Sequence, residues 1–369
     1  MKSKHIIIPV LLVAAFIFSG WGSTGHYHIS YRASLSYNQQ MQQFNQWTEI
    51  LADHASDADY RKSIDPYEGP RHYIDIDNYE TFFTSGRIPQ TLDSVIMLYG
   101  SNFVYDQGVL PWATLKTYDS LVACFTRLDW DKAVLFASDL GHYVADGHMP
   151  LHITRNYNGQ YSNNSGIHSR YESTMINAYI SQISYNGTQI SMVENVNQYV
   201  FDYIYANYTY VDSVLLADDY AKSISGNTNS SAYKQALWEY SQDFTTLLFK
   251  DASHALAELI YSAWTEAGSP LISASAIPES FTHSSISSLQ NFPNPFSAST
   301  NIQFSLDKSM QVNMKVMNHL GEIVDVILNE KMDTGDHNIL WNPQDLKKGV
   351  YFLVIENEND RLVRKMILQ

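Results

Sequence analysis

Histidine and aspartate are concentrated in the stretch Asp139–His152, which reads D-L-G-H-Y-V-A-D-G-H-M-P-L-H. The residues before it, D-W-D-K-A-V-L-F-A-S, are typical of a helix. On a helix, His142 and Asp146 are four residues apart and leave the same face, while Pro150 is expected to end the helix with His152 in the exit turn. The stretch can therefore supply ligands to more than one divalent metal, although an H-x3-D pair alone is more often an ordinary polar helix face.

The 369 residues are enough for two domains, or for one large domain with an appendage, and the 45% hydrophobic content is typical of a globular chain. A net charge of -15 argues against a basic nucleic-acid-binding groove. The negative charge does not exclude an enzyme that binds phosphate through metal ions, because bound cations dominate the local electrostatic field. Cys124 is the only cysteine, so the chain has no intramolecular disulfide.

The N-terminal residues 1–20 are typical of a secretory signal peptide. Two lysines precede an apolar run from Ile6 to Phe18, which is too short for a membrane span. Cleavage after Gly20 would make Trp21 the mature N-terminus, but the large Phe18 near the cut leaves the exact cleavage site open.

Two domains with different sequence patterns are expected after the signal peptide. Residues 21–267 predict a mainly α domain, with one helix up to Ala52, a helical region over 91–146, and further helices over about 193–220 and 232–267. Residues 268–288 are rich in Ser, Ala and Pro and predict a linker. Residues 289–369 contain short alternating runs separated by turn residues, which predict a small β-sandwich of the immunoglobulin type.

The helical domain contains a set of residues that could ligate metals. Two pairs, His142 with Asp146 and His168 with Glu172, have the i, i+4 spacing that places both side chains on one helix face. The free amine of Trp21 would add a nitrogen ligand. Histidine, carboxylate and amine ligands suit zinc, and the number of candidates suggests two or three ions. The candidate side chains are His26, Asp57, His72, His142, Asp146, His152, His168 and Glu172.

This ordered set resembles the trinuclear-zinc superfamily that joins bacterial zinc-dependent phospholipase C with the fungal single-strand-specific zinc nucleases. Members have an N-terminal Trp and a nearby His, then Asp and His, then H-x3-D-x5-H, and finally H-x3-D or H-x3-E. The resemblance covers roughly residues 21–267. Asp57 is matched to the first Asp position, although Asp59 is a close alternative.

The resemblance implies three zinc ions and an in-line hydrolysis of a phosphoric ester. A hydroxide between the first and third ions would attack phosphorus, and Asp57 and Asp146 would be the catalytic carboxylates. The first zinc would be held by Asp57, His72, His142 and Asp146; the second by His152, His168 and Glu172; and the third by Trp21, His26 and Asp146.

Glu172 resembles the phospholipase branch, since the nucleases of the family usually have Asp at that position. A phospholipase C-like phosphoric diester hydrolase is therefore the leading hypothesis. A single-strand nuclease or 3′-nucleotidase with the same metals is the alternative, so the substrate would be a phospholipid or a nucleic acid or nucleotide. A surface-binding protein whose metals are only structural is a third hypothesis. No obligate protein partner is evident.

The C-terminal residues 289–369 resemble the C-terminal sorting domain of the type IX secretion system. The resemblance rests on N-F-P-N-P-F at residues 291–296, G-V-Y-F-L at residues 349–353 and K-M-I at residues 365–367. It implies a secreted or cell-surface protein and a contact with the type IX machinery, and it leaves open whether the domain is removed after export. An adhesion module of the immunoglobulin type is the alternative.

Overall fold

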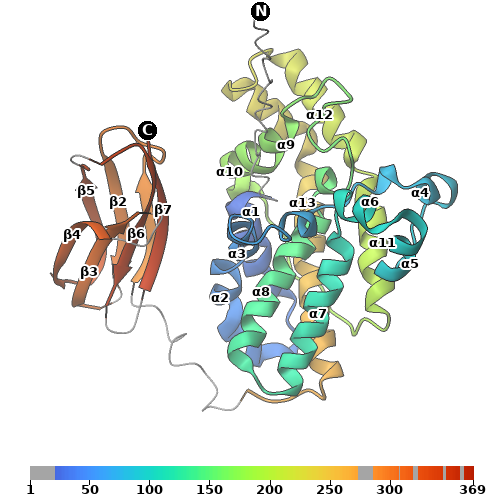
Figure 1. The fold of residues 1–369 in the computed structure, drawn as a ribbon, viewed down its shortest axis with the longest axis horizontal. Coiled ribbons are helices and arrows are strands. Elements are labelled where there is room, and N and C mark those ends of the chain that lie inside the picture. The colour runs from blue at the N-terminus through green and yellow to red at the C-terminus, as the bar shows by residue number, and fades with distance from the viewer. Residues whose placement is uncertain (1–20, 273–285, 307, 319–322, 344–345, 358–360) are drawn as a thin grey trace, which may run out of the picture. The chain divides into compact units, whose positions relative to one another are not determined.

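The computed structural model describes residues 21–272, 286–306, 308–318, 323–343, 346–357 and 361–369 (Figure 1). The chain divides into two compact units, residues 1–273 and 274–369. This division falls within the stretch 268–288 for which the sequence predicts a linker. The predicted signal peptide, residues 1–20, lies outside the described residues. None of the helices in the described part of the chain has the length and apolar character needed to cross a membrane.

The first unit is helical, as predicted. Its α-helices are α1 (Gly22–Arg32), α2 (Thr48–Asp53), α3 (Asp57–Arg61), α4 (Glu80–Ser85), α5 (Leu92–Tyr99), α6 (Ser101–Asp106), α7 (Leu110–Thr126), α8 (Trp130–Gly147), α9 (Ile167–Ser169), α10 (Ile176–Tyr179), α11 (Val196–Tyr208), α12 (Val211–Ile224) and α13 (Ser231–Glu266). Its 3₁₀ helices are η1 (Ala33–Ser36), η2 (Gln39–Trp47), η3 (Gly69–His72), η4 (Ile76–Asn78), η5 (Pro150–His152) and η7 (Ile180–Gln182), and η6 (Arg170–Met175) is a π-helix.

Helix α8 brings its C-terminal half into the interior of the domain. The carboxylate of Asp129 caps its N-terminus by accepting from the Lys132 backbone N–H. From Leu140 onward every residue up to Pro150 is buried. The helix ends at Gly147, and Met149 is extended because the residue directly before a proline disfavours the helical conformation. The buried end of α8 is the part that carries His142 and Asp146.

The 36-residue helix α13 packs along α7 and α8 (Figure 1). One face of this helix carries a buried apolar stripe, Leu248, Ala252, Ala255, Leu259 and Ala263, each at most 2% exposed. Burying one face of so long a helix at this spacing supplies a large share of the apolar core.

Two predicted helices are each divided in the structure. The helix expected to run to Ala52 breaks after η1, where Tyr37 is extended and Asn38 accepts from the backbone N–H groups of Gln40 and Met41. Asparagine is a strong N-cap residue, so it begins a new helical segment here. The helix expected over 193–220 is two helices, α11 and α12, with a turn at Thr209 and Tyr210.

The second unit is a β-sandwich, as predicted. Two antiparallel sheets, with strand orders β1-β2-β5 and β4-β3-β6-β7, contribute to one apolar core. Strand β2 alternates buried and exposed residues, so one face of its sheet packs inward. Strand β1 begins inside the stretch assigned to the linker. The strands are β1 (Ile286–Phe292), β2 (Thr300–Leu306), β3 (Met310–Met317), β4 (Ile323–Met332), β5 (Gly335–Trp341), β6 (Gly349–Glu356) and β7 (Arg361–Leu368).

Candidate metal centre

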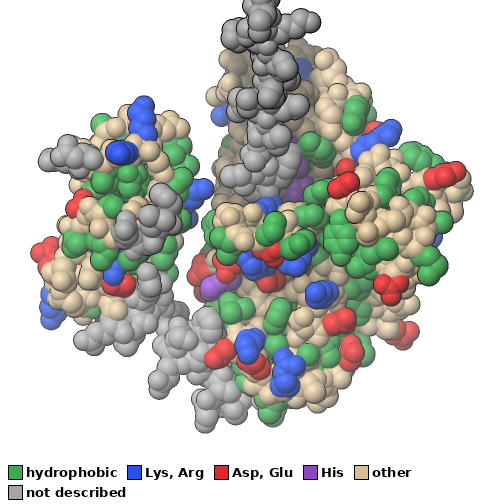
Figure 2. All heavy atoms as spheres, viewed as in Figure 1, with side chains coloured by type: hydrophobic (Ala, Val, Ile, Leu, Met, Phe, Trp, Pro, Cys, Tyr) green, Lys and Arg blue, Asp and Glu red, His purple; other side chains and the backbone are tan. Residues whose placement is uncertain are grey.

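Imidazoles and carboxylates from distant parts of the helical domain converge at the buried end of α8. Three groups of side chains have ligand atoms that all lie within 4.8 Å of one another. They are His26, His142 and Asp146; Asp59, His72 and His142; and His152, His168 and Glu172. All of them except Asp59 are buried. Figure 2 shows small patches of histidine on the face that it displays, one of them beside acidic and basic side chains.

Asp146 lies between the imidazoles of all three groups. Its Oδ2 is 3.0 Å from His72 Nδ1 and 3.2 Å from His142 Nε2. Its Oδ1 is 3.5 Å from His26 Nε2 and 3.2 Å from His152 Nδ1. Burial alone would raise the pKa of Asp146, but the neighbouring His142 and His152 imidazoles outweigh burial and hold this pKa well below its usual value. The carboxylate is therefore ionised and can bridge two metal ions.

Backbone carbonyl groups orient three of the imidazoles. The Nδ1 atoms of His142, His152 and His168 donate to the carbonyl oxygens of Ala55, His72 and Tyr157, at 2.7, 2.7 and 3.0 Å. A proton held at Nδ1 leaves the Nε2 lone pair free, and this is a common arrangement for histidines that bind metal. The Nε2 atoms of His152 and His168 lie 3.6 and 3.0 Å from Glu172 Oε2.

His26 on α1 is fully buried, and neither of its ring nitrogens makes a hydrogen bond with any residue that the structure describes. Its ring stacks on that of His142, with centroids 3.9 Å apart and planes 8° from parallel. Burial, followed by the nearby His142, lowers the pKa of His26 to about 3. At neutral pH His26 is therefore a neutral imidazole, with one ring nitrogen whose lone pair can bind a metal ion.

The cluster contains buried polar atoms that make no hydrogen bond within the described part of the chain, namely both ring nitrogens of His26, Nε2 of His72, Oδ1 of Asp146 and Oε2 of Glu172. Buried polar atoms in folded proteins are nearly always hydrogen-bonded, so several such atoms at one place require an explanation. A coordinated cation satisfies lone pairs of this kind, and histidine with carboxylate is a donor set that suits zinc. The residues present therefore fit a metal centre.

The two candidates for the first aspartate lie on opposite sides of α3. Asp59 Oδ1 is 3.7 Å from His72 Nδ1 and 3.8 Å from His142 Nε2. Asp57 instead accepts from His54 Nδ1 at 2.7 Å, and its side chain is 41% exposed. Asp57 is thus not among the converging side chains, and Asp59 replaces it in the site, which corrects the choice made from the sequence. Lys62 on the following turn donates to Asp59 at 2.7 Å.

Trp21 lies beside the cluster and is fully buried. Its indole Nε1 donates to the carbonyl oxygen of Ala145 at 2.9 Å, and its ring packs against Tyr171 and Phe249. The Trp21 side chain is therefore fixed against the last turns of α8, next to the residue that precedes Asp146. Its role as a main-chain ligand stays a prediction.

One buried residue of this region was not found from the sequence. Glu68 accepts from Tyr143 and from Arg61 and Arg71, and lies 3.4 Å from His72 Nε2. Burial alone would raise the pKa of Glu68, but the nearby His72 imidazole, the hydrogen bond from Tyr143 and the charge of Arg61 outweigh burial and lower this pKa to about 2. The only signal in the sequence is the i, i+4 spacing of Glu68 and His72.

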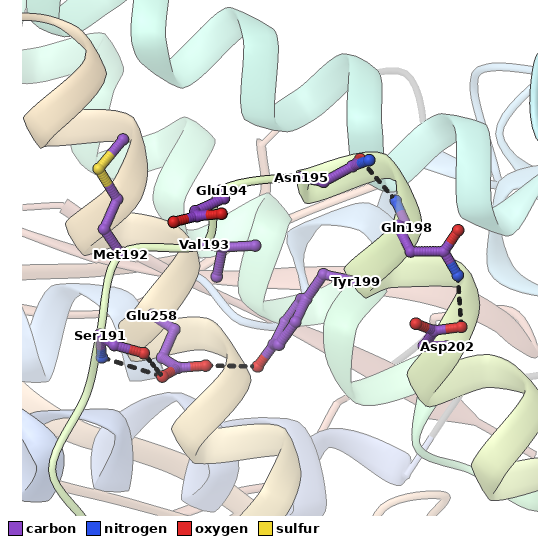
Figure 3. A pocket seen from close by; sticks show the side chains of 9 residues that line it. All are labelled: Ser191, Met192, Val193, Glu194, Asn195, Gln198, Tyr199, Asp202 and Glu258. Carbon is purple, nitrogen blue, oxygen red and sulfur yellow. Dashed lines mark hydrogen bonds between the residues drawn. The ribbon is translucent and has the colours of Figure 1, made fainter.

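A pocket of about 320 Å³ lies elsewhere in the helical domain, where the segment around Ser191 meets α11 and α13 (Figure 3). Glu258 accepts there from the backbone N–H and hydroxyl of Ser191 and from the hydroxyl of Tyr199. None of the converging metal-ligand candidates lines this pocket. The pocket is therefore a feature separate from the metal centre.

Comparison with known proteins identifies the second unit. Residues 290–369 match the secretion system C-terminal sorting domain. The match confirms the expectation drawn from the tail, and it indicates a secreted or cell-surface protein that interacts with the secretion machinery. The chain matches no curated protein.

Two solved structures of clostridial toxins are similar to the chain. An alpha toxin from Clostridium absonum has a TM-score of 0.42 and 10% sequence identity, over 95% of this chain and 98% of the toxin. The alpha-toxin of an avian strain of Clostridium perfringens has a TM-score of 0.42 and 11% identity over the same shares. Because both TM-scores are below 0.5, the function of the helical domain must be inferred from its own residues.

Proposed function

We propose that the helical domain is an exported, zinc-dependent hydrolase of phosphoric diesters, delivered by the type IX machinery. The observation that supports this most is the convergence of imidazoles and carboxylates around Asp146, with lone pairs that no hydrogen bond satisfies. Zinc bound there would supply Lewis acidity toward phosphoryl oxygens and would lower the pKa of bound water toward 7.

Three ions can be assigned to the side chains present. The first would be held by Asp59, His72, His142 and Asp146. The second would be held by His152, His168 and Glu172. The third would be held by His26, Asp146 and the main chain of Trp21 once the signal peptide is removed.

The chain's own residues prepare this site for an anionic substrate. The carbonyls behind His142, His152 and His168 keep a proton at each Nδ1, so that these rings need no reorientation to bind metal. Asp146 keeps its charge in a buried place, where it would serve as a ligand of both the first and the third ion. Lys62, whose side chain is 14% exposed, adds a positive charge at the edge of the cluster beside Asp59, which favours binding of a phosphate group.

For the substrate, Glu172 supports a phospholipid by its resemblance to the phospholipase branch. A different observation favours a nucleic acid. Tyr73 and Asp75 follow His72 in the chain, and both are half-buried. Burial, followed by the charge of Asp77, raises the pKa of Asp75 to about 7. An aromatic ring and an acid two residues apart could stack on a base and hydrogen-bond with its edge.

The test uses the protein that begins at Trp21, stripped of metal and reconstituted with zinc. Phosphatidylcholine vesicles and single-stranded DNA are assayed side by side, with His142→Ala as the inactive control. Release of phosphocholine alone would support a phospholipase, and cleavage of DNA alone would support a nuclease. Zinc binding without turnover of either substrate would support a structural metal centre, and activity that persists in chelator would overturn the proposal.

A further inference from the structure

Glu68 lies behind His72, on the side of the imidazole ring that faces away from Asp146. It is fully buried, and a buried carboxylate requires compensating partners. Arg71 donates to its Oε2 at 2.8 Å, Arg61 donates to the same oxygen at 3.3 Å, and the hydroxyl of Tyr143 donates to Oε1. The charge of Glu68 is therefore compensated without any metal ion.

These partners connect Glu68 to each segment that supplies a ligand for the first ion. Arg61 lies two residues after Asp59 on α3. Tyr143 follows His142 on α8. His72 itself belongs to η3, which begins directly after Glu68. One buried carboxylate thus holds together the three segments that form this part of the metal centre.

His72 is oriented differently from the other histidines that have a hydrogen-bonded ring. His142, His152 and His168 hold their Nδ1 proton against a backbone carbonyl and present Nε2 to the cluster. His72 presents Nδ1, which lies 2.9 Å from His142 Nε2 and 3.0 Å from Asp146 Oδ2. Among the described residues no group hydrogen-bonds its Nε2, and Glu68 Oε1 is 3.4 Å from this atom.

We propose that Glu68 is a positioning residue that holds the Nε2 proton of His72 and thereby turns Nδ1 toward the first zinc ion. The inference rests on the proposed metal centre and adds to it the residue that sets the affinity of this one ion. A carboxylate behind a ligating imidazole fixes the tautomer and makes the ring a better donor, and its loss typically weakens metal binding by about 10- to 100-fold.

The chain provides a closely matched control. Glu258 is also buried and accepts from the hydroxyl of Tyr199 at 2.8 Å. Its Oε1 lies 3.3 Å from Nε2 of His254, again four residues away in the sequence. Glu258 differs from Glu68 in that His254 belongs to none of the groups that could hold a metal.

The experiment compares wild type, Glu68→Gln and Glu258→Gln, each as the full chain from Trp21. Zinc is titrated against a chromophoric chelator, and cobalt replaces zinc for visible spectra that report ligand geometry. We expect Glu68→Gln to bind one of the three ions about 10- to 100-fold more weakly and to show a changed cobalt spectrum. Glu258→Gln is expected to bind all ions as wild type does, with an unchanged spectrum.

Wild-type affinities and spectrum in Glu68→Gln would overturn the inference, as would an equal loss in Glu258→Gln. If circular dichroism shows that Glu68→Gln does not fold, Glu68→Asp takes its place, because it keeps the charge between the arginines but withdraws the oxygen from His72. The same criteria then apply. A wild-type protein that binds no zinc would instead overturn the proposed function, so the two failures can be told apart.

Discussion

Replacing Asp146 by Asn should lower the affinity of the protein for two of the three zinc ions and leave the affinity for the remaining one unchanged. The substitution keeps the volume of the side chain but removes the charge that Oδ1 shares with His26 and that Oδ2 shares with His72 and His142. A structural zinc site with four ligands binds with about 10–16 kcal/mol, so one ligand accounts for about 3 kcal/mol, or about 100-fold in affinity. The group of His152, His168 and Glu172 keeps its ligands, because His152 Nδ1 also donates to the His72 carbonyl.

The assay is a zinc titration of the metal-free protein against a chromophoric chelator, with native mass spectrometry to count the ions. We expect Asp146→Asn to retain one ion with wild-type affinity and to lose the other two at zinc concentrations that saturate the wild type. Glu172→Gln serves as the complementary control, because it should lose only the ion that Asp146→Asn retains. Three ions bound by Asp146→Asn with wild-type affinity would refute the bridging role of Asp146.

Further predictions concern the ligand choice, the metal and the acid stability. Asp59→Ala should lose activity and one ion, whereas Asp57→Ala should keep both; the reverse result in a zinc titration would restore the choice made from the sequence. Chelation should destabilise the fold, by about 4 kcal/mol for each ion present at 1,000 times its dissociation constant, and an unchanged melting temperature in chelator would contradict a buried metal centre. For Glu258, burial alone would raise the pKa, but bonds from His254, Ser191 and Tyr199 lower it from 4.5 to about 2. The unfolded chain then binds the proton first, so Glu258 stabilises the fold above pH 4.5 and loses up to about 3 kcal/mol of that contribution as the pH falls to 2. Denaturant titrations across this window should show a weaker acid dependence in Glu258→Gln, and an unchanged dependence would contradict the assignment.

The features that follow from local spacing could be predicted from the sequence. A period near 3.6 locates α8 and α13, and the alternation of apolar residues locates most of the strands of the sorting domain. The four-residue spacing of His142 and Asp146 is enough to place both side chains on one helical face, because that helix is long and regular.

The choice between Asp57 and Asp59 could not be made in this way. Helix α3 has only five residues, so it shows no period that would tell the inner face from the outer. Residues two apart on a helix point in nearly opposite directions, and which of them faces inward depends on how α3 packs against α8. The interaction of Glu68 with Tyr143 could not be predicted from the sequence either, because the two residues lie 75 positions apart in the chain.

The division of the first long helix has a local cause that a periodic pattern does not show. The Asn38 side chain competes for the backbone N–H groups of the next turn and begins η2. A single capping residue of this kind has more influence on the backbone than the hydrophobic pattern around it.

The central claim is that zinc binds among the imidazoles and carboxylates around Asp146. Anomalous diffraction from crystals of the mature protein grown with zinc, recorded on both sides of the zinc absorption edge, tests it most directly. The account predicts three peaks: one among Asp59, His72 and His142, one at His26 and Trp21, and one among His152, His168 and Glu172. A crystal with no zinc peak among these residues would contradict the metal centre and the function built on it.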